Sequence, residues 1–212
     1  KHIGDRPVRW LLNAFGVDSR WCLVHATHIN EDETIGLANS GAVAGLCPST
    51  EANLGDGFFP LRNYINAGGT WGIGSDSHVS INPWEELRWL EYGQRLKTQS
   101  RNVAATNAGG STGLKLFNDA LKGGAQALGR PVGKIAVGNR ADLVILDPDH
   151  PQLYGRYGET FFDTLVFTNN GSPIRHVMCG GCWVVRDRLH SDEKRIFSHF
   201  RDVVSRLMAE PY

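Results

Sequence analysis

Three short apolar runs, separated by segments with helical patterns, constrain the fold of this chain more than any other feature. The runs cover residues 20–26, 42–47 and 70–75, and we expect each to form a strand. Strands that alternate with helices predict a parallel sheet with helical crossovers. His25 lies at the end of the first run and Asp76 follows the third. Barrel enzymes place reactive side chains at such strand ends, and a histidine with an aspartate there forms part of a metal-hydrolase site.

The composition is that of an ordinary globular protein, and it argues against some classes of binding partner. The 212 residues carry 22 basic and 22 acidic side chains, and 41% of the residues are hydrophobic. A formal net charge of zero gives no electrostatic basis for nucleic-acid binding, and no apolar run approaches the ~20 residues that span a membrane. The first residues lack the apolar core of a signal peptide. We therefore expect a cytoplasmic protein that binds a small-molecule substrate, and neither nucleic acid nor membrane.

The four cysteines are expected to be reduced thiols. Cys22 and Cys47 lie within apolar runs, where a buried thiol is predicted. Cys179 and Cys182 flank Gly180-Gly181, a pair typical of a two-residue hairpin turn. A redox or metal motif is the alternative, but the sequence offers no second cysteine pair to complete a zinc site.

Helical patterns fill most of the remaining chain up to residue 130. The helix over 30–39 begins with a capping box, in which Asn30 is the cap and Glu33 follows three residues later. Residues 49–60 are polar and rich in glycine, and are predicted to form a loop. Gly-x-Gly-x-x-Gly does not directly follow any expected strand, which argues against a dinucleotide site. The other predicted helices cover residues 7–15, 61–67, 83–97 and 112–128.

The pattern changes at Pro131, so we expect the chain to divide into residues 1–130 and 131–212. The second part is predicted to form a small β-module, with strands within residues 134–147, 163–167 and 174–186. A closing helix is predicted over 191–208. Its apolar face would consist of Ile196, Phe200, Val203, Val204 and Leu207.

Several segments carry a more specific signal. They are Leu23-Val-His-Ala-Thr-His28, Gly45-Leu-Cys-Pro-Ser-Thr-Glu-Ala-Asn-Leu-Gly-Asp-Gly57, Gly72-Ile-Gly-Ser-Asp-Ser-His-Val-Ser80 with the following Glu85-Glu-Leu-Arg-Trp-Leu-Glu-Tyr92, and the tail from Gly133 to Asp147. Together they resemble the amidohydrolase superfamily, and within it the deaminase branch. The resemblance covers nearly the whole chain. It implies an α/β fold: the C-terminal part of a (β/α)8 TIM-like barrel, followed by a small β-sandwich module.

The resemblance also implies one divalent metal, commonly zinc. Asp76 matches the eighth-strand aspartate that binds this metal, and His25 matches the sixth-strand histidine that contacts the attacking water or substrate. The family's His-x-His on the first strand, its histidine on the fifth and its proton-shuttling glutamate match nothing in this sequence. We therefore expect the C-terminal half of a longer enzyme, inactive alone, that either lacks its N-terminal half or forms a homodimer.

The reaction that the resemblance implies is hydrolysis of a C=N bond. The narrowest match implies N-formimino-L-glutamate and water as substrates, with N-formyl-L-glutamate and ammonia as products, a step of histidine degradation. His25 and Asp76 are the candidate catalytic residues, and His78 would support Asp76 by a hydrogen bond. Glu51 and Asn53 would bind substrate, since they lie in a loop on the same face. Two alternatives remain: an aminopurine or S-adenosylhomocysteine-type substrate on the same scaffold, or a non-catalytic module.

Overall fold

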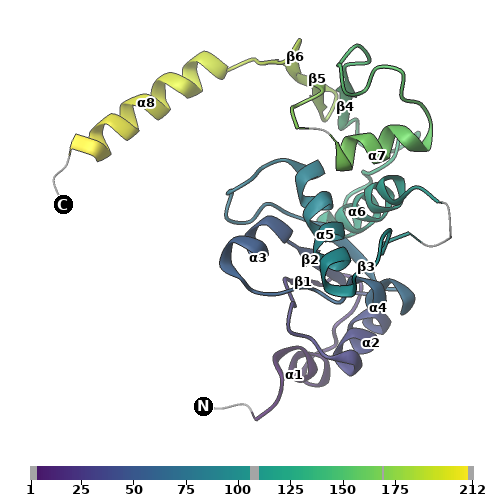
Figure 1. The fold of residues 1–212 in the computed structure, drawn as a ribbon. Helices are drawn as coiled ribbons and strands as arrows, with labels where there is room; N and C mark the ends of the chain where they lie inside the picture. The colour runs from purple at the N-terminus through teal and green to yellow at the C-terminus, as the bar shows by residue number, and fades with distance from the viewer. Residues whose placement is uncertain (1–3, 106–109, 169, 210–212) are drawn as a thin grey trace.

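The first part of the chain contains a three-stranded parallel sheet. The computed structural model describes residues 4–105, 110–168 and 170–209 (Figure 1). The strands are β1 (Cys22–Val24), β2 (Val43–Leu46) and β3 (Thr70–Ile73), hydrogen-bonded in the order β1-β2-β3. Leu23 pairs with Ala44, which pairs with Trp71. The parallel sheet predicted from the sequence is thus confirmed, with each strand shorter than its apolar run.

The helices expected in the first part are also confirmed, with ends that differ by a few residues at most. Asn30 caps its helix as predicted: its side chain accepts a hydrogen bond from the Glu33 amide, and the Glu33 carboxylate accepts one from the Asn30 amide. A left-handed Gly41 ends that helix. The helices are α1 (Pro7–Ala14), α2 (Glu31–Ser40), α4 (Leu61–Asn66), α5 (Pro83–Thr98) and α6 (Thr112–Leu128).

The prediction of a loop over residues 49–60 was wrong at its start, because α3 (Pro48–Leu54) occupies this segment. Proline is well tolerated in the first turn of a helix, where its missing amide has no partner to lose. The helix ends at Gly55, which has a positive φ of 71°. The polar residues of its first turn are buried and hydrogen-bonded to other elements, which a local reading of composition does not reveal.

The second part contains a four-stranded antiparallel sheet in the order β4-β5-β6-β7. The hairpin prediction is confirmed: Cys179 ends one strand and pairs with Cys182 at the start of the next, and Gly180 and Gly181 both have positive φ. All four cysteines are free thiols. The strands are β4 (Leu143–Leu146), β5 (Ile174–Cys179), β6 (Cys182–Arg186) and β7 (Leu189–His190).

Two strand predictions in this part were wrong. Residues 134–140 form no strand and contain bends and a turn at 137–138. Residues 163–167 belong to a helix, α7 (Glu159–Phe167), whose Leu165 and Val166 are buried in the main core. A short β-branched and aromatic run does not by itself distinguish a strand from a buried helix. Packing against α5 and α6 decides the outcome here.

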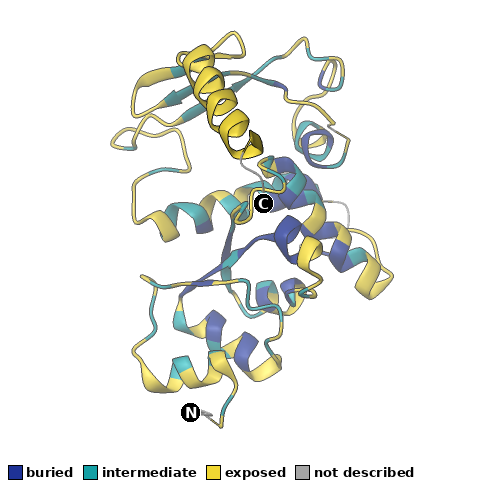
Figure 2. Cartoon of the chain, turned by 90° about the vertical axis from the view of Figure 1, so that its left-hand side faces the viewer, coloured by how far each residue is buried: buried dark blue, intermediate teal, exposed yellow. Residues whose placement is uncertain are grey.

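The core lies between the parallel sheet and the helices, where Figure 2 shows most of the buried residues. Helix α6 packs directly on β3. Gly123 makes this close approach possible, since a Cβ there would overlap the carbonyl of Trp71. Tyr64 is fully buried, and its hydroxyl lies 3.1 Å from the carbonyl oxygens of both Ala42 and Thr70. These contacts fix the positions of the strands whose ends carry the candidate site.

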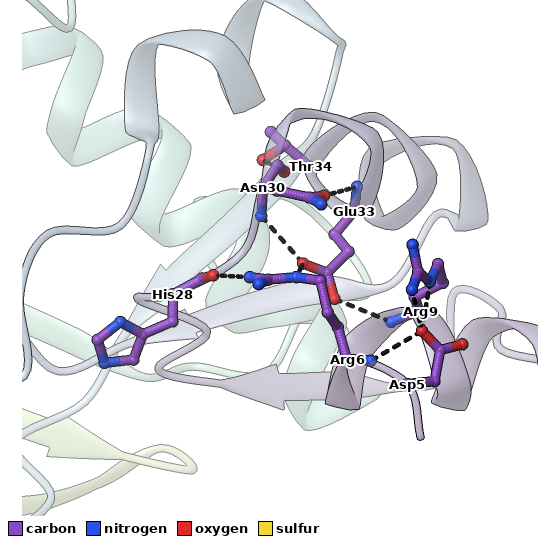
Figure 3. Close-up of polar contacts among 7 residues, drawn as sticks. All are labelled: Asp5, Arg6, Arg9, His28, Asn30, Glu33 and Thr34. Carbon is purple, nitrogen blue, oxygen red and sulfur yellow. Dashed lines mark hydrogen bonds and ion pairs between the residues drawn. The ribbon is translucent and has the colours of Figure 1, made fainter. Parts of the chain in front are cut away.

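A cluster of ionic contacts joins the chain before α1 to the start of α2 (Figure 3). Glu33 is buried, and its carboxylate accepts hydrogen bonds from the Arg6 guanidinium at 2.6 Å and from the Arg9 amide at 3.1 Å. Arg6 also donates to the carbonyl oxygen of His28. The His28 ring points away from this cluster in Figure 3. The cluster thereby holds the segment that follows β1 against α2.

Helix α8 (Glu193–Ala209) is confirmed as a helix, but its apolar face is not covered. All five residues predicted for this face are exposed, and Figure 1 shows α8 extending away from the rest of the chain. Cys22 was also wrongly predicted to be buried: it is exposed, whereas Cys47 is buried. Among the described residues, no helix combines the length and apolar character needed to cross a membrane.

Candidate active site at the ends of the parallel strands

The candidate site lies where the three parallel strands end. His25 directly follows β1, Cys47 follows β2 and Asp76 lies three residues beyond β3. The strand pairing continues to this edge, because His25 donates its amide to the Gly45 carbonyl at 2.8 Å. His25 and Asp76 then both adopt positive φ, at 65° and 47°. Such a conformation costs an ordinary residue about 1–2 kcal/mol and is found preferentially at functional sites.

The turns bring the two predicted catalytic side chains together. Nε2 of His25 lies 3.7 Å from Oδ2 of Asp76, and the side chains are 38% and 45% exposed. The structure thus places the acid and the imidazole side by side at the sheet edge and open to solvent. This separation is longer than a direct hydrogen bond.

The donor atoms at this edge fit a divalent cation. One ligand atom each from His25, Cys47 and Asp76 lie within 4.8 Å of one another. Two ligands on the same zinc ion, each about 2.0–2.3 Å from it, lie roughly 3–4 Å apart. The distance between His25 Nε2 and Asp76 Oδ2 falls in that range. Imidazole, thiolate and carboxylate are also the ligand types that zinc prefers.

Cys47 was not among the residues predicted for the site. Burial, with added repulsion from Glu51, Asp76 and Glu86, raises the pKa of its thiol to about 12. The thiol is therefore neutral at ordinary pH and would ligate a cation only after losing its proton. Its position at the end of the middle strand, between the strands that lead to His25 and Asp76, was the signal in the sequence that could have identified it.

Glu51 lies behind His25, with only 6% of its side chain exposed. Its Oε1 accepts the Cys47 amide at 2.9 Å and lies 3.3 Å from Nδ1 of His25. Burial raises the pKa of this carboxyl, and the hydrogen bonds from Cys47 and His25 partly oppose that effect. Glu51 was predicted to bind substrate from a loop, and it lies in α3 with its carboxyl against the imidazole. Its role in substrate binding stays a prediction.

Thr50, the neighbour of Glu51, holds the turn that carries Asp76. Its hydroxyl lies 3.1 Å from the Ser75 carbonyl oxygen and 2.8 Å from the Ser77 hydroxyl, and it accepts the Ser77 amide at 3.2 Å. The Ser75 and Ser77 contacts bracket Asp76 on both sides along the chain. No local sequence pattern indicates this role, because the contacts join residues 25 and 27 positions apart.

A second buried carboxylate fixes the first turn of α3. Glu86 of α5 accepts the Ser49 amide at 2.9 Å and the Ser49 hydroxyl at 2.5 Å. Burial raises the pKa of Glu86, and the two bonds from Ser49 act in the opposite direction. Helix α3 is thus anchored to α5 through Ser49, while its next two residues reach the turn around Asp76 and the ring of His25.

The structure does not bring the other two predicted residues into this cluster. Asn53 and His78 are both exposed. In the described ranges, neither side chain forms a hydrogen bond or ion pair with His25 or Asp76. His78 has a positive φ of 57°, and its amide donates to the carbonyl of Ser75. Their roles in substrate binding and in support of Asp76 stay predictions.

Comparison with known proteins agrees with this architecture. The model of the amidohydrolase family matches residues 5–184, so the chain belongs to the amidohydrolase family. It is 50% identical over 205 residues to a formimidoylglutamate deiminase of Pseudomonas aeruginosa, which covers 97% of this chain and 45% of that protein. It is 30% identical over 185 residues to a 5-methylthioadenosine/S-adenosylhomocysteine deaminase of Natronomonas pharaonis, covering 87% and 42%. The chain therefore spans less than half the length of either relative.

Solved structures show the same fold relationship. A crystal structure of an amidohydrolase from Brucella melitensis superposes with a TM-score of 0.91 at 43% identity, covering 98% of this chain and 45% of the other. An adenosine deaminase from Xanthomonas campestris, solved with bound zinc, gives a TM-score of 0.84 at 23% identity, covering 99% and 47%. At that identity the second structure supports the fold alone.

Proposed function

We propose that the protein containing this chain is a metal-dependent iminohydrolase. It would convert N-formimino-L-glutamate and water to N-formyl-L-glutamate and ammonia. The observation that carries the proposal is the approach of His25 Nε2 to Asp76 Oδ2, which lie 3.7 Å apart at the ends of β1 and β3, on either side of β2. Identity of 50% over nearly the whole chain to a formimidoylglutamate deiminase favours this substrate over others in the family.

We also propose that β1, β2 and β3 with their helices are the last part of a (β/α)8 barrel, with residues 1–130 in the barrel and 131–212 in a β-sandwich module. A complete barrel takes about 250 residues, and the parallel strands β1 and β3 each pair on one side only within the described residues. Reactive groups of such barrels gather at the carboxyl ends of the strands. His25, Cys47 and Asp76 occupy that edge.

The residues of this chain would divide the chemistry of the reaction between them. A divalent cation held at the site, zinc in our proposal, supplies the Lewis acidity that lowers the pKa of a bound water to about 7. Asp76 would hold that cation and accept a proton from the attacking water. His25 would hydrogen-bond the water and the oxygen that it adds to the formimino carbon. The carbon–nitrogen bond then breaks, and the nitrogen takes up protons and leaves as ammonia.

The residues of this chain that resemble the family do not include the remaining metal ligands. They also do not include the group that protonates the leaving nitrogen. We propose that these groups come from other residues of the longer protein, or from a second copy across the outer edges of β1 and β3. An unpaired strand edge is a template for such association. Light scattering on dilute protein tests the second possibility, and a stable monomer of these 212 residues would contradict it.

An aminopurine substrate is the second candidate, because 5-methylthioadenosine/S-adenosylhomocysteine deaminases match most of the chain at up to 30% identity. The two candidates differ in charge and shape, since one substrate is a flexible dicarboxylate and the other a flat ring. Ammonia release by the intact protein, measured with each substrate, discriminates between them. Release from S-adenosylhomocysteine but not from N-formimino-L-glutamate would overturn our assignment.

Replacing Asp76 by Asn tests the mechanism in the intact protein. The amide cannot accept the proton of water and binds a cation less well, so we expect turnover to fall by at least 100-fold, the scale of a lost acid–base group. Asp149→Asn is the matched control, because Asp149 is an exposed acid in the second part of the chain. Near-normal rates for Asp76→Asn would refute the role of Asp76. If the intact protein is active and contains no bound metal, metal dependence is refuted. If the intact protein is inactive and binds no metal, the result favours the non-catalytic module.

A further inference from the structure

One oxygen atom of the Glu51 carboxyl contacts both the backbone amide of Cys47 and the imidazole of His25. Oε1 accepts the Cys47 amide at 2.9 Å and lies 3.3 Å from Nδ1 of His25. An amide nitrogen can only donate, so this oxygen is an acceptor. Where Oε1 carries no proton, Nδ1 of His25 donates to it, because two acceptors would repel each other. The conclusion holds for the carboxylate and also for a carboxyl protonated on its other oxygen.

We propose that Glu51 is a positioning residue, which keeps the proton of neutral His25 on Nδ1 and leaves Nε2 unprotonated on the side of the ring that faces the candidate site. The two nitrogens of a neutral imidazole have opposite roles, and the bond made by one fixes the role of the other. Nε2 is the nitrogen that lies 3.7 Å from Asp76. With its lone pair free, it can accept a hydrogen bond from the attacking water or bind a cation.

Three features of the surroundings make Glu51 suited to this role. Its side chain is almost fully buried, whereas that of His25 is 38% exposed. One side of the imidazole is therefore open to solvent, and Glu51 contacts it from the buried side. Glu51 itself is fixed by the Cys47 amide and by its place in α3, which Glu86 anchors through Ser49. Burial keeps water from replacing the carboxyl as the partner of Nδ1.

The catalytic meaning of this inference rests on the proposed function, but the tautomer can be measured without substrate. We would label histidine with ¹⁵N in the intact protein, free of added metal, and record the imidazole nitrogen shifts near neutral pH. The signals of His25 are identified by their loss in His25→Gln. We expect an N–H type signal for Nδ1 and a lone-pair type signal for Nε2. The opposite pattern in the unmodified protein would overturn the proposal outright.

Three variants separate positioning from folding. Glu51→Met removes the acceptor with little change in volume, and should shift His25 toward the other tautomer and lower kcat by about 10- to 100-fold, the usual effect of removing such a support. Glu51→Gln keeps an acceptor oxygen and should retain the tautomer and most of the activity. Glu91→Met is the matched control: it also removes a buried carboxylate that accepts backbone amides, those of Val103 and Ala104, and it should lower the melting temperature while leaving the tautomer unchanged.

The outcomes are distinct. An unchanged tautomer in folded Glu51→Met, or the same change in Glu91→Met, would overturn the proposal. Loss of the tautomer in folded Glu51→Gln would do so as well, since the acceptor is kept. If Glu51→Met does not fold, the unmodified protein and Glu51→Gln still decide the question. Failure of the substrate assignment would show as a lack of ammonia release with the tautomer intact, so the two proposals fail separately.

Discussion

The hydroxyl of Thr50 offers a sensitive test of how the fold holds Asp76. Thr50→Val keeps the shape of the side chain and removes the oxygen that contacts the Ser75 carbonyl and the amide and hydroxyl of Ser77. A typical hydrogen bond contributes about 0.5–1.5 kcal/mol, and an orphaned buried group costs about 1–3 kcal/mol. Because these groups are only partly buried, water can replace some of the loss. We therefore expect the free energy of unfolding to fall by about 1–2 kcal/mol.

The same change should weaken the proposed metal site. Asp76 has a positive φ of 47°, a conformation that costs about 1–2 kcal/mol and persists only while its surroundings hold it. Without Thr50 the turn can relax, and the carboxylate leaves the position 3.7 Å from His25. We expect zinc affinity, measured by titration calorimetry on the intact protein, to fall at least 10-fold, as for other supports of metal ligands.

Thr34→Val is the matched control for this prediction. Thr34 is as deeply buried as Thr50, and its hydroxyl donates to the Asn30 carbonyl at 2.6 Å, within α2 and its cap and away from the site. That carbonyl keeps the Thr34 amide as a partner. We expect a loss of about 0.5–1.5 kcal/mol in urea unfolding and no change in zinc affinity. Equal zinc affinity for Thr50→Val, Thr34→Val and the unmodified protein would refute the reasoning.

Two further predictions concern the scaffold. Gly123→Ala should destabilise the protein by about 1–3 kcal/mol or more, because its Cβ would overlap the Trp71 carbonyl. Gly124→Ala should stabilise the protein by up to about 1 kcal/mol, because a Cβ at that position meets nothing within 4 Å. Thermal melts that rank the two variants the other way would contradict the packing of α6 on β3. Glu33 supplies a pH dependence: burial raises its pKa, but the bonds from Arg6 and from the Asn30 and Arg9 amides outweigh this and lower it overall. Its contribution to stability is therefore complete above the ordinary pKa of 4.5 and is lost as the pH falls through the lowered value. Glu33→Gln should flatten the acid limb of stability in urea unfolding, and an unchanged limb would count against the ion pair.

The predictions that succeeded rest on patterns confined to one element. The capping box of Asn30 and Glu33 works through residues three positions apart, and the Gly180-Gly181 turn requires only local φ values. The parallel sheet followed from the alternation of apolar runs with helices. His25 and Asp76 were chosen because each follows such a run, and the structure brings the two side chains to 3.7 Å although β2 lies between β1 and β3. Their catalytic roles stay predictions.

The predictions that failed depended on distant partners. The segment that begins at Pro48 was expected to be a loop because its residues are polar, yet Ser49 is satisfied by Glu86, 37 positions away. Residues 163–167 were expected to form a strand. They belong to helix α7, which buries Leu165 and Val166 in the main core. The apolar face of α8 was predicted from the helical spacing of its hydrophobic residues. In the described part of the chain, no segment covers this face.

The sequence by itself determined that helices alternate with parallel strands, and that an imidazole and a carboxylate end two of them. Only the tertiary structure decided that the middle strand adds the Cys47 thiol, and that Thr50 and Glu51 hold the two turns from behind. The physical reason is one of range. Backbone preferences and apolar periodicity act over a few residues, whereas hydrogen bonds between buried side chains depend on which segments the folded chain brings together.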